Sequence, residues 1–381
     1  MHKKIIALAI AACASGSASA QSNVTLYGVL DLAYLYSSGN GANGGQNTFS
    51  GISGVGAGSR LGFRGEEALG NGLKAVFTLE YGLDPDINCG VGTCGLNARQ
   101  QFVGLAGGFG TVALGRQYAP GFNATARNDA LDASDMSIQS SLSALNGYTI
   151  TPNSPARFNN AVTYTSPNWS GLQVSAIYGF GETGSEGVNR GIYNSNTVSP
   201  DDNSKWGIGV NYANGPLNLD LLFQQRISVT EFSPLGVKLP GFGGNISEWY
   251  AGGSWDFQVV KLFASYQALN NDNDVRVTGG LDRSNLWTLG VSAPLGRGTL
   301  GLSYGRLTAD YQSGVSDGVS WGAGTMYTYP LSKRTSLYGA YSYFNNNSTV
   351  FVPGQVIAVP GVVGAAGENN YAIGAGITHS F

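Results

Sequence analysis

Few side chains in this chain could carry out catalysis. Of its two histidines, His2 lies within residues 1–20 and His379 lies on the apolar face of the last predicted strand. A Ser-His-Asp site would have to use His379, and no group of His, Cys and acidic residues has the spacing of metal ligands. The glycine-rich segment 54–58 is similar to a phosphate-binding loop, but a strand follows it where that loop needs a helix. These residues predict that the protein is not an enzyme and uses no metal or other cofactor.

Basic residues on the predicted strands are the other chemically active groups. Arg60, Arg64 and Lys74 lie opposite the apolar residues of their strands, so their side chains point away from the hydrophobic face. A cation at the middle of a bilayer costs roughly 2–4 kcal/mol, whereas in a water-filled lumen it costs little. Such cations would sort small solutes by charge. The alternative is that they only brace the wall by pairing with acidic residues such as Glu66 and Glu80.

Strands with a period of two position these groups. In residues 24–36 Leu26, Leu30 and Leu32 share one parity with Val24, Tyr34 and Tyr36, and in residues 371–381 Ile373, Ile377 and Phe381 share one parity. The opposite parity holds glycine, small polar or charged residues, which suits a hydrated interior better than packing against a second sheet. We expect sixteen strands, an even number that places both termini on the periplasmic side. Their approximate bounds are 23–36, 59–67, 72–83, 97–106, 111–118, 158–166, 171–180, 204–213, 217–226, 247–256, 259–268, 284–293, 299–307, 320–329, 335–344 and 370–381.

The composition fits a membrane barrel better than a soluble protein. Charged residues make up 11% of the chain, against about 25% in soluble domains, and no segment beyond residue 20 approaches the ~20 apolar residues of a transmembrane helix. The 20 basic residues are outnumbered by 23 acidic ones, so we expect no nucleic-acid partner. Short turns such as 69–72 alternate with long polar stretches such as Ser37–Ser59 and 345–368, as in outer-membrane barrels. A soluble array of β-sandwiches would need two or more domains, and no linker divides the chain.

The ends of the chain and its cysteines carry further signals. Residues 1–20 are predicted to be a signal peptide, with a positive start, an apolar run and small residues before the cleavage site. Residues 21–381 are then a single barrel domain. Cys13 follows a lipoprotein-like box, which is the alternative processing site. Cys89 and Cys94 remain in the exported chain as a candidate disulfide that closes a small loop.

Six segments along the chain carry a resemblance to a known family. They are 24–28 (VTLYG), 60–67 (RLGFRGEE), 110–118 (GTVALGRQY), 261–264 (KLFA), 331–335 (LSKRT) and the terminal Phe381. In this order and spacing they resemble the general porins of Gram-negative bacteria, of the beta-proteobacterial type. The resemblance implies an all-β, sixteen-stranded antiparallel barrel in the outer membrane, a homotrimer, and a third long loop folded into the pore. It also implies a water-filled channel for passive diffusion of ions and small hydrophilic solutes.

Two further expectations concern the outer surface and the assembly of the barrel. Phe381 resembles the terminal aromatic residue that the outer-membrane insertion machinery reads as an assembly signal. That machinery, outer-membrane lipid and small solutes are the expected partners besides the protomers themselves. Small outward residues on the first strands would let protomers approach closely, and these are Gly28, Gly65, Ala113 and Gly115.

The resemblance makes residues 119–157, the connection after the fifth predicted strand, the loop inside the pore. This loop carries three acidic residues, Asp129, Asp132 and Asp135. Strand parity turns Arg60, Arg64 and Lys74 toward the lumen, whereas Arg99 and Arg116 are placed there by the resemblance. Because cations outnumber the acids, we expect a weak preference for small anions. The expected pore constriction sets the loop acids against Arg60, Arg64, Lys74, Arg99, Arg116 and Arg157.

The sequence leaves two other functions open. A substrate-specific outer-membrane channel for sugars or organic acids should carry a ladder of aromatic residues along its lumen. A structural or adhesin barrel should have a plugged lumen. The lumen parity here is mostly Gly, Ser, Thr, Asn and Gln, which favours unselective passage.

Overall fold

The computed structural model describes the chain from residue 23 onward, with gaps. The predicted signal peptide, residues 1–20, and the candidate disulfide between Cys89 and Cys94 lie outside the described residues, so both stay predictions. The described residues are 23–41, 44–88, 97–144, 147–181, 203–229, 243–274, 281–311, 317–347, 357–362 and 364–381.

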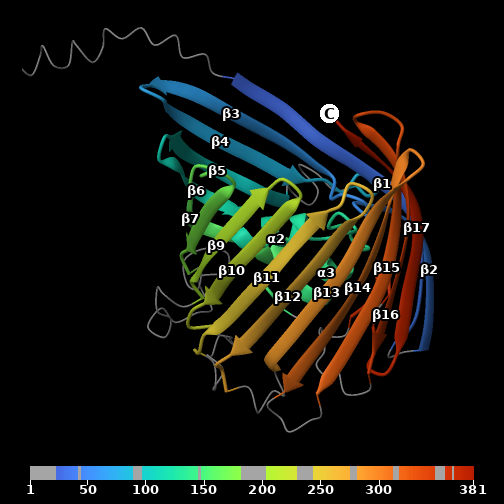
Figure 1. Ribbon diagram of the computed structural model, residues 1–381. Helices are drawn as coiled ribbons and strands as arrows, with labels where there is room; N and C mark the ends of the chain where they lie inside the picture. Colours follow the sequence, from blue (N-terminus) through green and yellow to red (C-terminus); the bar gives the residue numbers. More distant parts are fainter. Residues whose placement is uncertain are drawn as a thin grey trace, which may run out of the picture.

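Antiparallel strands form one closed barrel (Figure 1). From β3 to β17 each strand pairs with the next, and the barrel closes where β1 pairs with β17, from Val29 opposite Ser380 to Gly39 opposite Asn370. Because β2 and β3 are two parts of the second wall strand, the prediction of sixteen strands is confirmed. The strands are β1 (Asn23–Gly41), β2 (Gly44–Ser53), β3 (Arg60–Gly70), β4 (Leu73–Gly82), β5 (Asn97–Gly107), β6 (Gly110–Tyr118), β7 (Arg157–Thr165), β8 (Leu172–Gly179), β9 (Lys205–Asn214), β10 (Leu217–Arg226), β11 (Ile246–Asp256), β12 (Lys261–Asn271), β13 (Leu281–Leu295), β14 (Gly298–Tyr311), β15 (Gly318–Pro330), β16 (Thr335–Asn346) and β17 (Asn369–Ser380).

The second wall strand is interrupted. Residues 23–29 of β1 pair with β3, and residues 32–41 of β1 pair with β2. Between β2 and β3 the chain leaves the wall, and Val55 is fully buried there. The expectation of a long loop over Ser37–Ser59 is therefore wrong. Ser, Gly and Asn occupy both parities at the tip of this hairpin, so period-two alternation gives no signal for its strands.

The two faces of the wall differ in chemical character. The outward residues Leu221, Val103 and Leu289 are 62%, 59% and 55% exposed, whereas the inward Gln224 and Gln267 are fully buried. An apolar outer face and a polar inner face are what a barrel in lipid requires. Among the described residues, no helix is long and apolar enough to cross a membrane.

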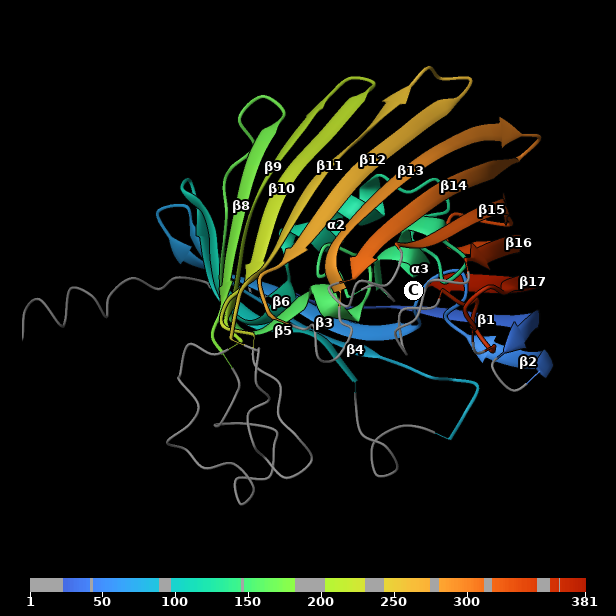
Figure 2. The ribbon, with the colours of Figure 1, turned by 90° about the horizontal axis from the view of Figure 1, so that it is seen from below.

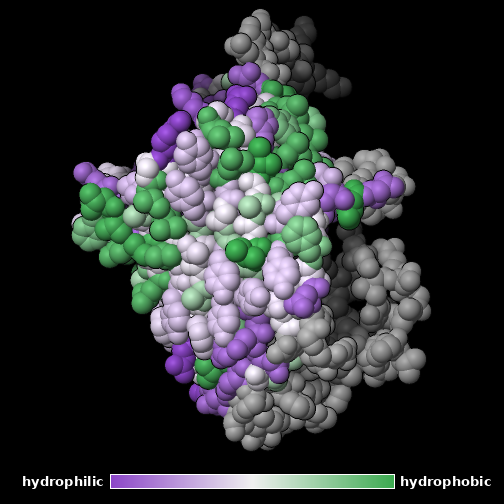
Figure 3. All heavy atoms as spheres, turned by 90° about the vertical axis from the view of Figure 1, so that its right-hand side faces the viewer, coloured by the Kyte–Doolittle hydropathy of each residue, from purple (hydrophilic) through white to green (hydrophobic). Residues whose placement is uncertain are grey.

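Aromatic rings line the outer surface toward the long-loop end. The rings of Trp287, Tyr304, Trp321 and Tyr343 follow one another across β13–β16, with centroids 5.4, 5.9 and 5.4 Å apart. Figure 3 shows the side of the barrel near β17 and the β1–β2 hairpin, where residues of intermediate hydropathy cover the middle, hydrophobic residues lie above and to the left of them, and hydrophilic residues gather toward the lower end. Amphipathic rings at such a level fit the membrane–water interface.

Two of the four small residues expected on the outer surface lie on the inner one. Ala113 is 2% exposed, and the next residue of its parity, Gly115, pairs with the inward Phe102. Val112 and Leu114 are the exposed residues of β6. The expectation is wrong because the alternation of β6 was assigned with an error of one residue, and such an error moves every side chain of a strand to the opposite face.

The connection between β6 and β7 lies inside the barrel (Figure 2). It contains α2 (Pro120–Arg127), α3 (Ile138–Ala144) and a 3-10 turn, η1 (Ser154–Ala156). Helix α3 packs against β13, β14 and β15, where Ile138 and Leu142 are fully buried. Apolar burial therefore holds α3 against the inner wall.

Part of the last long connection also turns inward. Ile357 and Val359 are 0% and 2% exposed. The side chain of Asn370 on β17 donates to the carbonyl of Ile357 at 2.9 Å and accepts the N–H of Val359 at 2.8 Å. The stretch 345–368, expected as an extracellular loop, therefore places residues 357–359 against the inner wall.

Candidate pore constriction

The loop inside the barrel is bound to one side of the wall by Glu248 on β11. This carboxylate is 1% exposed and accepts the N–H of Thr149 at 3.0 and 2.8 Å and the N–H of Ile150 at 2.9 Å. The Thr149 hydroxyl donates to it at 2.9 Å, and Arg226 lies 3.3 Å away. A buried wall carboxylate thus satisfies two backbone donors of the loop with charge-assisted hydrogen bonds.

Two further contacts fix the loop to the same side. Asp220 on β10 accepts Nη2 of Arg127 at 2.6 Å and the side-chain amide of Asn128 at 2.9 Å. Gln139 of α3 donates to Gln267 of β12 at 2.7 Å. In Figure 2 α2 and α3 lie between these strands and β3–β4, so the anchored loop faces the opposite wall.

The tip of the loop is held by the interrupted second strand. The N–H of Asp135 donates to the carbonyl of Val55 at 3.0 Å. The inward-turned segment is bound in turn by Asp31 on β1, which accepts the N–H of Gly56 at 3.1 Å and the hydroxyl of Tyr338 at 2.8 Å. A Cβ atom at Gly56 would lie 2.6 Å from the Tyr338 ring, so the close approach requires glycine. Asp31 thus positions the loop tip through Val55.

Glu80 on β4 is the centre of a basic cluster on the opposite wall. It accepts Nε of Arg99 at 2.9 Å and lies 3.8 Å from Nε of Arg60. The hydroxyls of Tyr27 and Tyr118 donate to it at 3.0 Å each. Two guanidinium groups therefore share one carboxylate, and the cluster keeps a positive charge.

A β-bulge turns Arg99 toward the lumen. Glu80 pairs with Gln100 and Tyr81 pairs with Ala98, so Arg99 is the extra residue on β5. A bulge re-aims a side chain, and it brings Arg99 onto the face of Glu80. Simple alternation would have placed Arg99 with the outward Val103, which is why periodicity alone could not orient it.

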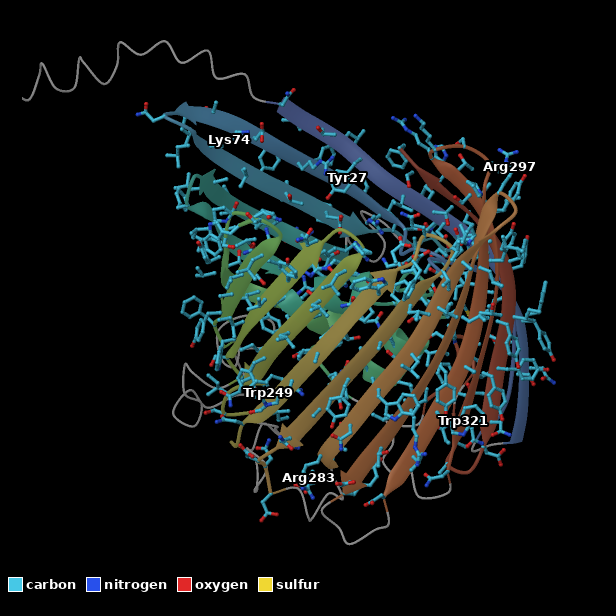
Figure 4. All side chains as sticks on the ribbon, viewed as in Figure 1. Tyr27, Lys74, Trp249, Arg283, Arg297 and Trp321 are labelled. Carbon is cyan, nitrogen blue, oxygen red and sulfur yellow. The ribbon has the colours of Figure 1, made fainter. Side chains whose placement is uncertain are left out.

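Two more arginines lie against aromatic rings beside this cluster. Cζ of Arg157 is 5.6 Å from the ring centre of Tyr118 and 5.8 Å from that of Phe122, and these two rings stack 3.8 Å apart. Cζ of Arg64, an exposed residue, is 5.3 Å from the ring centre of Tyr27, which Figure 4 labels. Among the described residues neither arginine has a carboxylate at ion-pair distance. Ring faces stabilise both cations without cancelling their charge.

Lys74 lies apart from the cluster, and Arg116 lies within electrostatic reach of Arg157 but makes its contacts elsewhere. Lys74 is at the short-turn end of β4, where it forms an exposed ion pair of 2.9 Å with Glu66 (Figure 4). Arg116 has the outward parity of β6, donates to the carbonyl of Ala98 at 2.8 Å and donates to the side chain of Asn159. We assign both residues to bracing of the wall. The structure brings together four of the six basic residues, namely Arg60, Arg64, Arg99 and Arg157.

Asp129 turns away from the lumen and into its own loop. It accepts the N–H of Leu131 at 2.9 Å, the N–H of Ala133 at 3.2 Å and the hydroxyl of Ser137. Burial raises the pKa of Asp129 to about 6. This carboxylate organises the loop tip and contributes no exposed charge to the passage.

Asp132 and Asp135 are the exposed carboxylates of the loop tip. Desolvation raises the pKa of Asp132, while the nearby Lys261 on β12 lowers it. Desolvation inside the barrel raises the pKa of Asp135 to about 6; the negative charge of Asp31 adds to this and Arg99 opposes it. Asp135 is therefore the loop carboxylate within electrostatic reach of the basic cluster.

Sequence reasoning missed the residues that fix the loop. Asp31, Asp220 and Glu248 are acidic residues on the inward parity of their strands, and this was the only signal for them. Their partners lie far along the chain, as with Thr149 and Glu248, which are 99 residues apart. Nothing local in the sequence links such pairs.

Comparison with known proteins settles the family. A family model described as Gram-negative porin matches residues 7–349. The chain belongs to the Gram-negative porins. The predicted family, barrel and outer-membrane location are confirmed, and this porin forms a channel of the outer membrane, a class of protein that is not a class of enzymes.

The relatives of this porin include beta-proteobacterial proteins. It is 33% identical to outer membrane porin protein 32 of Delftia acidovorans, over 100% of both chains. It is 30% identical to an outer membrane porin protein of Bordetella pertussis, over 91% of this chain and 95% of that one. A solved anion-selective porin from Comamonas acidovorans is 28% identical with a TM-score of 0.76, over 95% of this chain and 100% of that one.

Proposed function

We propose that this porin is a homotrimeric diffusion channel with a preference for small anions, set where the inner loop faces the basic cluster. The observation that carries the preference is an imbalance of charge. Arg60 and Arg99 share Glu80, Arg157 adds a further cation, and the loop presents Asp135 against them. Fixed charges act strongly where low-dielectric walls are close and salt screens little. The similar porin from Comamonas acidovorans is anion-selective, which supports the proposal.

Replacing Arg60 and Arg64 with serine should shift the reversal potential in a salt gradient toward cation preference and raise the conductance. Each charge at about 4 Å from a passing ion is worth about 1 kcal/mol in water, so loss of both should lower the anion-to-cation permeability ratio by about tenfold or more. Glu80 keeps its hydrogen bonds to Arg99 and Tyr118, so the wall stays intact. Planar-bilayer recordings measure both quantities.

Arg116→Ser is the matched control for this experiment. It removes a guanidinium on the outward parity of β6 that takes no part in the pairing around Glu80, so the selectivity should shift far less than in the Arg60→Ser/Arg64→Ser protein. Parent selectivity in the Arg60→Ser/Arg64→Ser protein would mean that these arginines only support the wall. The anion proposal would then be lost.

Asp135 should make the selectivity depend on pH. Its pKa is raised to about 6, so the loop carries this negative charge above pH 6 and loses it below. The anion preference should therefore increase as the pH falls from about 7 to about 5. Asp135→Asn should hold the higher preference at both pH values, and Asp84→Asn, an exposed carboxylate beyond the end of β4, should keep the transition. A midpoint near the ordinary aspartate pKa of about 4 would contradict this assignment.

The homotrimer is supported by an exposed aromatic pair as well as by the family. Tyr34 and Phe49 of the β1–β2 hairpin are 68% and 73% exposed, and their rings stack 5.9 Å apart. Large exposed rings are typical anchors of protein–protein contacts.

On unboiled gels the parent should migrate at about three times its monomer mass. A closed barrel whose strands are all paired resists the detergent, so the trimer should stay assembled. Tyr34→Ser/Phe49→Ser should migrate as a monomer, whereas Leu221→Ser, at an outward residue of β10 that is 62% exposed, should remain a trimer. A monomeric parent from gently extracted membranes would count against the homotrimer.

A further inference from the structure

Three cations occupy two neighbouring turns at the short-turn end of the barrel. Arg297 lies in the turn between β13 and β14, Lys333 and Arg334 lie in the turn between β15 and β16, and all three are exposed. Cζ of Arg297 is 5.6 Å from the ring centre of Tyr329, near the end of β15, so the two turns lie side by side. Figure 4 shows Arg297 at this end of the barrel and Arg283 at the other.

The second of these turns is held in one conformation. The hydroxyl of Ser332 accepts the N–H of Arg334 and of Thr335, each at 3.1 Å. The carbonyl of Arg334 accepts the N–H of Ser380 from β17 at 2.8 Å. A fixed turn presents its two cations with little ordering cost when a ligand binds.

Lipid-facing apolar side chains lie directly beside the cations. Leu295 and Leu331, in or next to the same turns, are 55% and 50% exposed, and Leu337 on β16 is 42% exposed. Such residues face hydrocarbon in an outer-membrane barrel, and the short turns of these barrels are periplasmic. The three cations therefore lie at the depth of the headgroups of the periplasmic leaflet.

Among the described residues, these cations have no acidic partner at ion-pair distance. Residues 294–299 and 330–336 contain no Asp or Glu. By contrast, Arg283 at the far end lies 3.5 Å from Asp282 and 3.6 Å from Asp310.

We infer that the two turns form a binding site for the phosphate of anionic phospholipids in the periplasmic leaflet of the outer membrane. The guanidinium and ammonium groups donate to phosphate oxygens, and Arg297 is steadied by the ring of Tyr329. The acyl chains lie along Leu295, Leu331 and Leu337, so the surface recognises both parts of a lipid. An anionic headgroup is preferred over a zwitterionic one because these turns offer no carboxylate to a choline or ethanolamine.

The test uses the protein purified from outer membranes into a non-ionic detergent. Native mass spectrometry counts bound dioctanoyl phosphatidylglycerol and, separately, dioctanoyl phosphatidylcholine across a titration. The parent should bind phosphatidylglycerol more tightly. Arg297→Gln/Lys333→Gln/Arg334→Gln should weaken that binding by about tenfold or more, because each basic residue near an anionic surface is worth about 1 kcal/mol. Arg283→Gln is the matched control and should bind like the parent, since this arginine is already paired.

Equal affinity of the parent for the two lipids, or parent-like phosphatidylglycerol binding by the triple variant, would overturn the inference. Inorganic phosphate at matched concentrations should leave the lipid bound, and displacement would mean that the turns take phosphate rather than lipid. Heat-modifiable migration of the triple variant checks that it folds. Its conductance and ion selectivity should equal those of the parent, so this test and the test of the pore succeed or fail separately.

Discussion

Replacing Glu248 with alanine is expected to release the inner loop from the wall and to raise the single-channel conductance. The substitution removes the acceptor of the Thr149 and Ile150 amides and the partner of Arg226. The partly buried Arg226 would lose its carboxylate partner and two loop amides would lose their acceptor, at a cost of about 1–3 kcal/mol for each buried group left unpaired. This cost falls when the loop moves into water. A loop that leaves the wall no longer narrows the passage to a fixed width, so the recorded current should also become noisier.

Two variants separate this effect from a general loss of stability. Glu248→Gln keeps the shape of the side chain and one oxygen acceptor, so it should give an intermediate result. Glu66→Ala breaks an exposed pair with Lys74, whose side chains are 54% and 47% exposed, and such a pair is worth about 0–1 kcal/mol. Hydrogen exchange at Thr149 and Ile150 should accelerate only in the Glu248 variants. Parent conductance and exchange in Glu248→Ala would mean that the other contacts hold the loop by themselves.

Deleting Phe381 should lower the amount of folded protein in the outer membrane several-fold and leave the conductance of each assembled channel unchanged. The backbone of Phe381 exchanges two hydrogen bonds with Gly28 of β1, each of 3.1 Å, and its ring covers that glycine. The deletion removes these contacts from the seam that closes the barrel, at a cost of about 2–4 kcal/mol. It also removes the terminal aromatic residue that resembles an assembly signal. Immunoblots of outer-membrane fractions, followed by bilayer recordings, measure the two effects.

Substitutions at and near the same strand end identify what the ring does. Phe381→Tyr keeps an aromatic ring and should assemble like the parent, whereas Phe381→Ser should resemble the deletion. Ile373→Ser removes an outward side chain of the same strand that is 53% exposed, and it should assemble better than the deletion. If the deletion variant, synthesised at the same rate as the parent, reached the parent's amount of folded protein in the outer membrane, the terminal ring would have no role in assembly.

The wall of this barrel was predictable from its sequence because lipid and water impose opposite demands on alternate residues. Leu219 and Leu221 face lipid, and Asp220 between them is 1% exposed on the inside. This contrast repeats along most strands, so their number and the lumen side of Arg60 and Arg64 follow from parity. It fails on the β1–β2 hairpin, where small and polar residues fill both parities.

The constriction was only partly predictable, because its geometry depends on irregular and distant contacts. Arg99 reaches Glu80 through a bulge that no periodic pattern reveals. The orientation of Asp129 depends on amides of its own turn, so a carboxylate expected to face the lumen lies buried. Lys74 was correctly placed on the inward parity. Parity, however, says nothing about the position of a residue along the barrel axis, and Lys74 pairs with Glu66 near the short-turn end, away from the constriction.

The buried carboxylate of Asp31 ties the width of the channel to the completion of folding. Asp31 is on β1, and its partners Tyr338 and Thr378, on β16 and β17, follow it by 307 and 347 residues. Contacts between residues so distant in sequence form late, because closing a very long loop first costs conformational entropy. Before β16 and β17 are in place, Gly56 lacks its contact with Tyr338. The position of Val55 is then not fixed, so its carbonyl cannot hold the loop tip at Asp135. The constriction therefore reaches its final width only after β16 and β17 have joined β1 and closed the barrel.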